Sequence, residues 1–342
     1  MMIIKTPSRL HMTLIDLNGS YGRADGGIGL TLADPNFSLK SELSDNGVMI
    51  DFDSEINSNE IKSECIKKIT SSAEKTMSYY NIDGGFHFTV KKAYLPHSGL
   101  GSGTQISLAT SKLVYEHLKE DNSISTTDST FDKDISSVEL GKITGRGGTS
   151  GIGIFSFDYG GFILDGGHNL KEKGTFLPSA ASPAKPPHLL GIYDFPEEWD
   201  IIVAIPRADT SVTGQKEVDI FTEYCPVPKQ DVEKLSHLIL MNLLPFLLEK
   251  NIECFGKSID QIQNLGFKKV EVNLQSDIIK SAMANMREAG AYGVGMSSFG
   301  PSIYGITEGN TKEVFKATKE FIGENGDVFI TKAQNTGYEL QR

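Results

Sequence analysis

The fold is best indicated by one glycine-rich stretch, Leu95-Pro96-His97-Ser98-Gly99-Leu100-Gly101-Ser102-Gly103-Thr104-Gln105, which runs into a segment of helical character at 104–119. The start of a helix carries unpaired N–H groups and a partial positive charge, and glycines let a phosphate group approach the backbone. The stretch therefore predicts a phosphate- or pyrophosphate-binding loop, in which the Ser102 and Thr104 hydroxyls are also candidate metal ligands. The alternative is a glycine turn with a serine cap. No Gly-Lys-Ser/Thr follows, so the pattern is not a P-loop.

Three further segments, 22–29, 141–167 and 290–305, concentrate glycine, and together with 99–103 they hold most of the 35 glycines in the chain. Consecutive backbone N–H groups near Arg146 are suited to form an anion-binding nest, with the guanidinium as a fork for phosphate or carboxylate. For each segment ordinary turn or loop chemistry stays open as the alternative. Charged and polar candidates gather in or beside these segments: Arg9, His11, Asp16, Arg23, Asp25, Arg146, Ser150, Asp165, His168, Ser297 and Ser298.

Composition excludes several classes of protein. The 342 residues carry a net charge of −11, which argues against a nucleic-acid-binding surface. Three widely spaced cysteines show no disulfide or metal-ligand spacing, which fits a reducing cytoplasm. No metal-binding pattern of histidines stands out, and the most apolar run, 238–248, is too short to span a bilayer. That run suits a protein core and a homodimer interface equally well.

Periodicity predicts interleaved strands and helices in two halves, hence two α+β or α/β domains. We place the boundary after the proline-rich linker 178–188, giving domains 1–188 and 189–342, and expect the polar segment 122–137 to be a solvated loop. Strands are predicted at 1–10, 28–43, 86–90, 153–158, 161–165, 200–205, 302–306 and 327–332. Helices are predicted at 55–80, 104–119, 138–144, 231–251, 276–288 and 311–323.

With these segments in place, the sequence resembles the GHMP superfamily of small-molecule kinases. The phosphate motif of that superfamily, Pro-x-x-x-Gly-Leu-Gly-Ser-Ser-Ala, is followed from Pro96 to Thr104, with Gly103 and Thr104 in place of Ser-Ala. Pro7-x-Arg9-Leu10 and the stretch 295–301 match its first and third motifs. The resemblance implies an α+β, two-domain, ATP-binding-like fold. It further implies a left-handed βαβ crossover in the N-terminal domain, a ferredoxin-like C-terminal domain and a ligand between the two.

One departure from the superfamily bears on the chemistry. Many of these kinases carry Pro-Ser-Gly-x-Asp, whose aspartate acts as a base toward a hydroxyl acceptor. The corresponding stretch here resembles 149–153, with Gly153 where the carboxylate belongs. Deprotonation of an alcohol would then need another base. This weighs against an ATP-dependent kinase, which nevertheless stays the alternative because some superfamily kinases also lack the aspartate.

A closer resemblance covers nearly the whole chain, to the family of β-ribofuranosylaminobenzene 5′-phosphate synthases. It is carried by 9–11, 14–19, 22–29, 145–153, 159–162, 165–168 and 224–228. The resemblance implies an archaeal, methanogen-type cytoplasmic transferase of methanopterin biosynthesis, with small-molecule substrates and neither nucleic acid nor membrane as partner. The enzyme would condense phosphoribosyl pyrophosphate with 4-aminobenzoate or 4-hydroxybenzoate, releasing CO2 and pyrophosphate. It would use Mg²⁺ but no pyridoxal phosphate or haem. A non-catalytic ligand-binding protein on the same scaffold is a third hypothesis.

The resemblance and the residue inventory together give expected roles. We expect catalytic functions for Asp16, Arg23, Asp25 and His168, with the division of labour among the acidic residues left open. Arg23→Ala and Asp16→Ala are predicted to cripple turnover while leaving the fold intact. Phosphate or pyrophosphate would be bound by Ser98, Gly99, Gly101, Ser102, Gly103, Thr104, Arg146 and Gly148. The rest of the substrate would be bound by Arg9, His11, Ser150, Asp165, Ser297 and Ser298.

Overall fold

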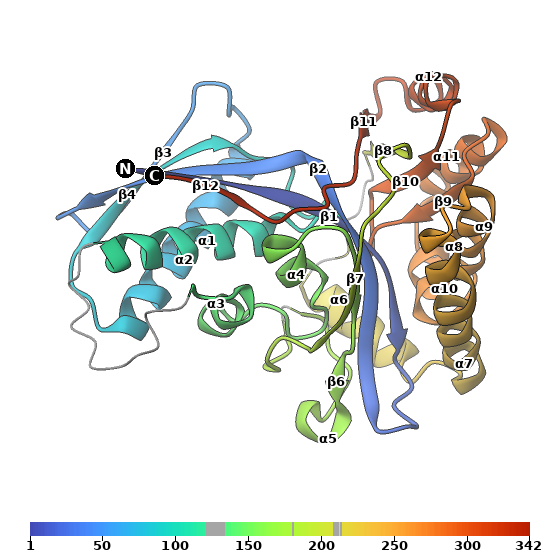
Figure 1. Cartoon of the computed structure of the whole chain (residues 1–342), viewed down its shortest axis with the longest axis horizontal. Helices are drawn as coiled ribbons and strands as arrows, with labels where there is room; N and C mark the ends of the chain where they lie inside the picture. The colour runs from blue at the N-terminus through green and yellow to red at the C-terminus, as the bar shows by residue number, and fades with distance from the viewer. Residues whose placement is uncertain (121–133, 180, 208–211, 213) are drawn as a thin grey trace.

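Two β-sheets, each covered by helices, form the protein in a computed structural model that describes residues 1–120, 134–179, 181–207, 212 and 214–342 (Figure 1). Most of the loop expected at 122–137 lies outside the described residues. Among the described helices, none has the length and apolar character needed to cross a membrane.

The larger sheet is built on two long antiparallel strands, β1 (Met2–Asp16) and β2 (Arg23–Ser44). The strands run in the order β12-β1-β2-β4-β3, while β5 and β6 also pair with β2, and β7 pairs with β5. The remaining strands of this sheet are β3 (Val48–Phe52), β4 (Gly85–Lys92), β5 (Phe162–Asp165), β6 (His168–Asn169), β7 (Leu189–Tyr193) and β12 (Glu339–Gln341). Among these described strands, β3 and β4 form the parallel pair, and α1 (Asn59–Tyr80) connects them. This is the expected βαβ crossover; its handedness stays a prediction.

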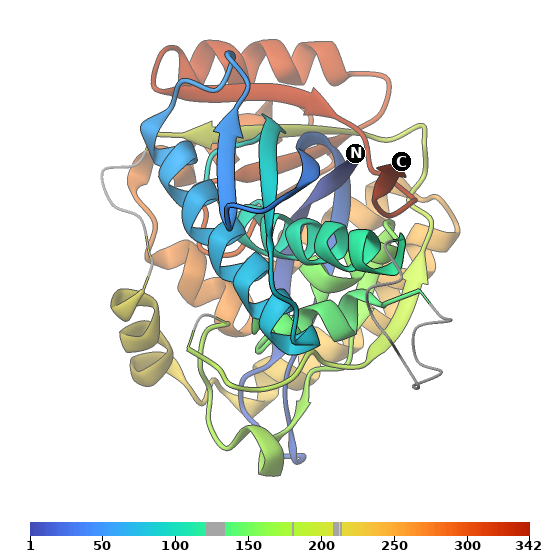
Figure 2. The same cartoon turned by 90° about the vertical axis from the view of Figure 1, so that its left-hand side faces the viewer.

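Helices pack on one face of the larger sheet (Figure 2). Besides α1 these are α2 (Ser102–Glu120), α3 (Ser137–Thr144) and α4 (Ile152–Asp158). The central helix α2 is buried along almost its whole length, and it contains a buried ion pair between Lys112 and Glu116 at 2.8 Å. The helix can lie this deep because apolar side chains surround it and its charges are paired.

The smaller sheet has the antiparallel order β11-β8-β10-β9. Its strands are β8 (Asp200–Pro206), β9 (Gly293–Met296), β10 (Ile303–Thr307) and β11 (Gly326–Thr331). Helices separate β8 from β9, and α12 (Thr311–Ile322) separates β10 from β11, which confirms the expected ferredoxin-like arrangement. The other helices are α5 (Leu170–Lys173), α6 (Gln215–Tyr224), α7 (Lys229–Leu238), the π-helical turn η2 (Ile239–Leu243), α8 (Leu244–Leu248), α9 (Ile252–Ile262), α10 (Gly266–Asn273) and α11 (Asp277–Glu288).

Most predicted elements are confirmed within a few residues, but 153–158 is a helix, α4, and the prediction of a strand there was wrong. All residues from Ile152 to Phe157 are buried. A short helix surrounded by core has no polar face, so its sequence cannot be distinguished from that of a buried strand. The single helix predicted at 231–251 is instead α7, η2 and α8 in succession, and the glycine-rich stretch 290–301 contains β9.

Strand β1 connects the two parts of the molecule. Helices α2 and α4 contact it, and so do α7, α10 and β9 of the second part. Its edge is completed by β12, with Ile4 opposite Leu340, so the two termini lie side by side (Figure 1). Arg342 also donates to Glu116 on α2 at 2.8 Å. The domain division after residue 188 stays a prediction, and β7 and β12, which follow that point, pair within the larger sheet.

Candidate functional site

A cavity of about 290 Å³ lies along β1, at the N-terminus of α2. Strand β1 contributes Arg9, His11 and Leu14 to its wall, and an extended strand covers roughly 15 Å over that distance. Many residues that the sequence pointed to line the cavity together: Arg9, His11, Gly99, Gly101, Ser102, Gly103, Thr104, Arg146, Ser150 and Ser298. Four chain segments that are far apart in sequence therefore meet here.

The glycine loop shapes the phosphate-binding end of the cavity. Gly99 and Gly101 have φ of 89° and 83°, in the left-handed region that favours glycine. A Cβ at Gly101 would lie 3.0 Å from the Arg9 side chain, so the loop backbone and this guanidinium are packed directly together. Arg9 Nη1 also donates to the Gly99 carbonyl oxygen. Immediately afterwards α2 begins at Ser102, with its first N–H groups at the cavity wall.

Arg9, Lys68 and Arg146 make this end of the cavity cationic. Arg146 lies over the loop, since a Cβ at Gly103 would be 2.7 Å from its Nη2. Its Nε is enclosed and has no hydrogen-bond partner among the described residues. Burial lowers the pKa of Arg9 to about 10 and also lowers that of Arg146, because removal from water disfavours the charged form. Guanidinium groups held in this way are available to an anionic ligand.

Hydrogen bonds from the glycine-rich segment 290–305 hold β1 and the phosphate loop together. Ser297 Oγ accepts from the His11 N–H at 2.9 Å and donates to the Gly99 carbonyl oxygen at 2.7 Å. The Ser298 N–H donates to the His11 carbonyl oxygen, and the Ser302 N–H to that of Ser98. Ser297 thus positions the loop without lining the cavity, whereas Ser298 lines it. Ser98 is buried beside the loop, and its hydroxyl donates to the Leu95 carbonyl oxygen.

Replacing Ser297 with alanine is expected to lower the free energy of unfolding by about 1–3 kcal/mol, because two buried hydrogen bonds are lost. The loop would also shift relative to Arg9, raising the KM for an anionic ligand. Urea denaturation and steady-state kinetics measure both effects. Ser302→Ala is a matched control, since the buried Ser302 hydroxyl lies in the same segment and has no partner among the described residues. If Ser297→Ala and Ser302→Ala were equally stable, Ser297 would not hold β1 and the glycine loop together.

His11 is a buried imidazole at the middle of the cavity. Neither of its ring nitrogens has a hydrogen-bond partner within the described part of the chain. Burial holds its pKa well below the usual value, and the nearby charges of Arg9 and Lys268 lower it further. The ring is therefore neutral at pH 7, with one donor and one acceptor left for a bound molecule.

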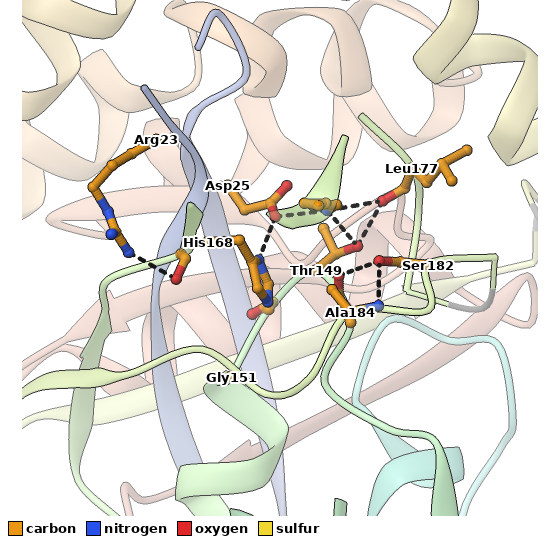
Figure 3. A network of polar contacts seen from close by, with 12 residues as sticks. Arg23, Asp25, Thr149, Gly151, His168, Leu177, Ser182 and Ala184 are labelled. Carbon is orange, nitrogen blue, oxygen red and sulfur yellow. Dashed lines mark hydrogen bonds and ion pairs between the residues drawn. The ribbon is translucent and has the colours of Figure 1, made fainter. Parts of the chain in front are cut away.

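Asp25 and His168, two of the expected catalytic residues, bind each other outside the cavity lining (Figure 3). Asp25 Oδ2 lies 2.6 Å from His168 Nδ1 and 2.6 Å from Lys173 Nζ. His168 Nε2 lies 2.8 Å from the Lys185 carbonyl oxygen, so both ring nitrogens face oxygen atoms. Lys173 Nζ also donates to Thr149 Oγ1 at 3.3 Å. Since Thr149 lines the cavity, this network positions its wall.

Asp165 is hydrogen-bonded to the segment of the cavity wall that contains Thr149 and Ser150. Its carboxylate accepts from the Gly151 and Gly167 N–H groups, each at 3.0 Å, and lies 3.4 Å from Ser150 Oγ. Burial raises its pKa to about 7 despite these hydrogen bonds. Gly148 lies in the wall segment, where its carbonyl oxygen accepts from Ser182 Oγ at 2.5 Å. Ser150 lines the cavity directly.

Asp16 and Arg23 do not line the cavity. Asp16 Oδ1 accepts from the N–H groups of Asn18 and Gly19 and so caps the turn after β1. Arg23 is exposed and donates to the Gly166 and Gly167 carbonyl oxygens (Figure 3). The loss of turnover predicted for their alanine variants would therefore have to act through the β1–β2 turn and the 165–168 segment, not through contact with substrate.

The sequence interpretation gave no role to several residues of the cavity wall, among them Glu64, Lys68, Glu217, Phe221, Glu271 and Phe299. Five of them lie on helices of ordinary amphipathic pattern, where a residue facing a cavity looks like one facing solvent or core. Phe299 lies within the glycine-rich segment 290–305, next to the serines for which the sequence predicted a binding role. Among the described residues no group of three or more His, Cys, Asp and Glu side chains could hold a metal ion.

Comparisons with known proteins cover the whole chain. Residues 64–161 match the N-terminal domain of the GHMP kinases, and residues 243–323 match their C-terminal region. A solved structure of L. major mevalonate kinase in complex with R-mevalonate superposes with a TM-score of 0.66 at 12% identity, covering 97% of this chain and 96% of that one. This likeness shows the fold alone.

Two archaeal relatives are far closer in sequence. The chain is 48% identical to a protein of Methanothermobacter thermautotrophicus over 98% of its own length and 97% of the relative. It is 43% identical to a protein of Methanocaldococcus jannaschii over 99% of its own length and all of the relative. Both relatives are named β-ribofuranosylphenol 5′-phosphate synthase.

Proposed function

Because the chain belongs to the β-ribofuranosylphenol 5′-phosphate synthase family, within the GHMP kinase fold, we propose that it joins phosphoribosyl pyrophosphate to 4-hydroxybenzoate, releasing CO2 and pyrophosphate. The product would be a C-riboside 5′-phosphate of methanopterin biosynthesis. The word phenol in the relatives' names favours the hydroxy acid over 4-aminobenzoate, two acceptors that the sequence left open. A cytoplasmic site of action fits a biosynthetic enzyme of this kind.

The observation that carries the proposal is the division of the cavity into two chemically different ends. Arg9, Lys68 and Arg146 surround the glycine loop at one end, which suits the pyrophosphate and the 5′-phosphate of the ribosyl donor. Leu14, Phe221 and Phe299 line the other end, which suits an aromatic ring. An anionic sugar phosphate and an aromatic acid would thus meet near His11.

In this arrangement the protein stabilises the departing pyrophosphate. The first N–H groups of α2 and the guanidinium groups of Arg9 and Arg146 are fixed donors toward the negative charge that develops as the bond to C1 breaks. The electron-poor ribosyl carbon is then attacked by the ring carbon that bears the carboxylate. Neutral His11 is placed to bind a ribose hydroxyl or the carboxylate by a hydrogen bond.

The donor set at the cationic end fits Mg²⁺. The Ser102 and Thr104 hydroxyls and the Glu64 carboxylate line the same part of the wall, and hard oxygen donors suit this ion. This small number of protein ligands agrees with an ion that is bound chiefly by phosphate oxygens and water. When bound, Mg²⁺ would neutralise charge on the pyrophosphate.

Incubation with phosphoribosyl pyrophosphate, Mg²⁺ and carboxyl-labelled 4-hydroxybenzoate is expected to release labelled CO2 and pyrophosphate in equal amounts. Carboxyl-labelled 4-aminobenzoate tests the other acceptor. No release with either acid would overturn the proposal. The alternative, an ATP-dependent kinase, predicts instead that ATP is consumed with an alcohol. The packing around Gly153 weighs against a catalytic base at this position, because a Cβ there would lie 3.2 Å from Thr104 Cγ2.

A homodimer stays a prediction. The structure shows which residues of the apolar run 238–248 are buried and which are exposed. Leu243, Leu244 and Leu247 are buried in it. Leu240, Met241 and Leu248 are 56%, 63% and 64% exposed. Light scattering of the wild type and of Met241→Glu tests whether this face joins two copies.

A further inference from the structure

The end of the cavity formed by α6 and α10 contains two carboxyl groups that no step so far uses. Glu217 lies in the first turn of α6, and Glu271 lies on α10. Glu271 is buried and pairs with Lys268, which is itself fully buried and donates to the Met296 and Ser298 carbonyl oxygens. Glu217 makes no ion pair with any described residue. One of the two carboxyl groups is therefore available to a ligand.

Aromatic and aliphatic side chains surround this pair. Leu14, Phe221 and Phe299 line the cavity and belong to one buried apolar cluster that also contains Phe267. The Phe267 ring lies 4.6 Å from that of Phe221 and 5.8 Å from that of Phe299, measured between centroids. The three rings hold one another in fixed positions, so this end of the cavity is a preformed apolar pocket with a carboxyl group at its wall.

The charges of the cavity fix the direction in which an aromatic acid can enter. Its carboxylate is repelled by Glu217, whereas the Glu271 charge is balanced by Lys268, and it is attracted to the cationic end with Arg9 and Arg146. A para hydroxyl group then points toward the acidic end. In this direction the carboxylate-bearing carbon faces the ribosyl donor, as the reaction requires. His11, buried and without a hydrogen-bond partner for its ring among the described residues, lines the same cavity.

We propose that Glu217 binds the para hydroxyl group of the acceptor and removes its proton, with the ring enclosed by Leu14, Phe221 and Phe299. The inference rests on the proposed function and assigns the residue that activates its acceptor.

The atoms and electrons of this step balance. As the hydroxyl proton passes to Glu217, the ring carbon that bears the carboxylate forms a bond to C1 of the ribose. Pyrophosphate leaves with the electron pair of the C1–O bond. The ring is then a dienone, and loss of CO2 returns the electron pair of the broken C–C bond to the ring and its oxygen. Glu217 gives the proton back to that oxygen, so the enzyme ends unchanged.

The surroundings of Glu217 suit a base. Burial raises its pKa to about 7, with a further contribution from the Glu271 charge. The other titratable groups at this end are Lys268, which pairs with Glu271, and His11 on β1, whose low pKa keeps it neutral at pH 7. A carboxyl group with this pKa accepts a proton more readily than an exposed glutamate does.

The test compares Glu217→Gln with Glu223→Gln, an exposed glutamate on the same helix. With 4-hydroxybenzoate, Glu217→Gln is expected to lower kcat about 100-fold, the usual effect of losing a general base. The KM for phosphoribosyl pyrophosphate should stay within about twofold, since the cationic end is untouched. In the wild type kcat/KM should rise through about pH 7, and this rise should vanish in Glu217→Gln while persisting in Glu223→Gln.

A binding measurement keeps the test independent of turnover. Calorimetry with 4-hydroxybenzoate and benzoate is expected to show about tenfold tighter binding of the hydroxy acid to the wild type and no difference in Glu217→Gln. Unchanged kcat, pH profile and selectivity in Glu217→Gln would overturn the assignment of Glu217. A wild type that releases no CO2 would instead overturn the proposed function.

Discussion

Replacing Arg146 with alanine is expected to lower kcat/KM for phosphoribosyl pyrophosphate by about 10²–10³-fold, the effect of removing one fixed donor from a developing negative charge. The Arg146 guanidinium lies over Gly103 at the start of α2, and its Nε has no partner among the described residues. Because Arg146 lines the cavity and its Nε makes no hydrogen bond to a described residue, its removal should affect substrate binding while the stability of the fold changes little.

Two further variants sharpen this expectation. Arg146→Lys retains the charge without the planar fork and should recover part of the loss. Lys142→Ala removes an exposed cation one turn earlier, on α3, and should leave kinetics unchanged. Steady-state rates of CO2 release measure all three. A loss below about fivefold in Arg146→Ala would remove this residue from the phosphate site, since a charge-assisted hydrogen bond contributes more.

Replacing Asp25 with asparagine is expected to lower the free energy of unfolding by about 3–5 kcal/mol, the cost of breaking a buried ion pair from one side. The Asp25 carboxylate is fully enclosed between His168 and Lys173, and the Lys173 side chain is 1% exposed. Without the carboxylate, the buried Lys173 ammonium loses its ion-pair partner and His168 Nδ1 loses its hydrogen-bond partner. Asparagine retains the size of the side chain and tolerates the positive φ of 64° at this position.

Urea denaturation measures this effect. Asp34→Asn is the control, because Asp34 is more than half exposed and pairs with the exposed Lys92. Adding Lys173→Met to Asp25→Asn should restore part of the stability, since it removes the unpaired Lys173 charge. If Asp25→Asn were as stable as the wild type but inactive, Asp25 would act on the substrate directly instead of positioning the cavity wall.

The cationic end of the cavity was predictable from the sequence because its signals are local. Glycines and a helix start adjoin each other at 99–104, and α2 begins at Ser102, within that stretch. The acidic end was not predictable. Glu217 and Glu271 lie on separate amphipathic helices, and only the packing of α6 and α10 against β1 brings them to one wall. Nothing in either helix distinguishes these glutamates from those at the surface.

In the glycine-rich hairpin, the sequence and the structure point to different functions for the same residues. Asp25 and His168 carry chemistry-bearing side chains in glycine-rich segments, and the sequence interpretation made both catalytic. The second partner of Asp25, Lys173, lies on the four-residue helix α5, whose composition of Leu, Lys and Glu gives no signal of burial. An ion pair inside a protein is visible only when both partners are placed, so a lone buried aspartate looks like a candidate for catalysis.

The pairing of Ile4 with Leu340 has a consequence for synthesis of the chain on the ribosome. Strand β1 emerges long before β12, the strand that covers part of its outer edge, because all strands of the smaller sheet lie between the two in the chain. Until then the nascent chain exposes unpaired backbone groups beside Ile3, Ile4 and Lys5, a template for wrong pairing with another chain. Closing so long a loop also slows folding. The last native contacts of the larger sheet, including Arg342 with Glu116 on α2, therefore form only after translation of the smaller one is complete.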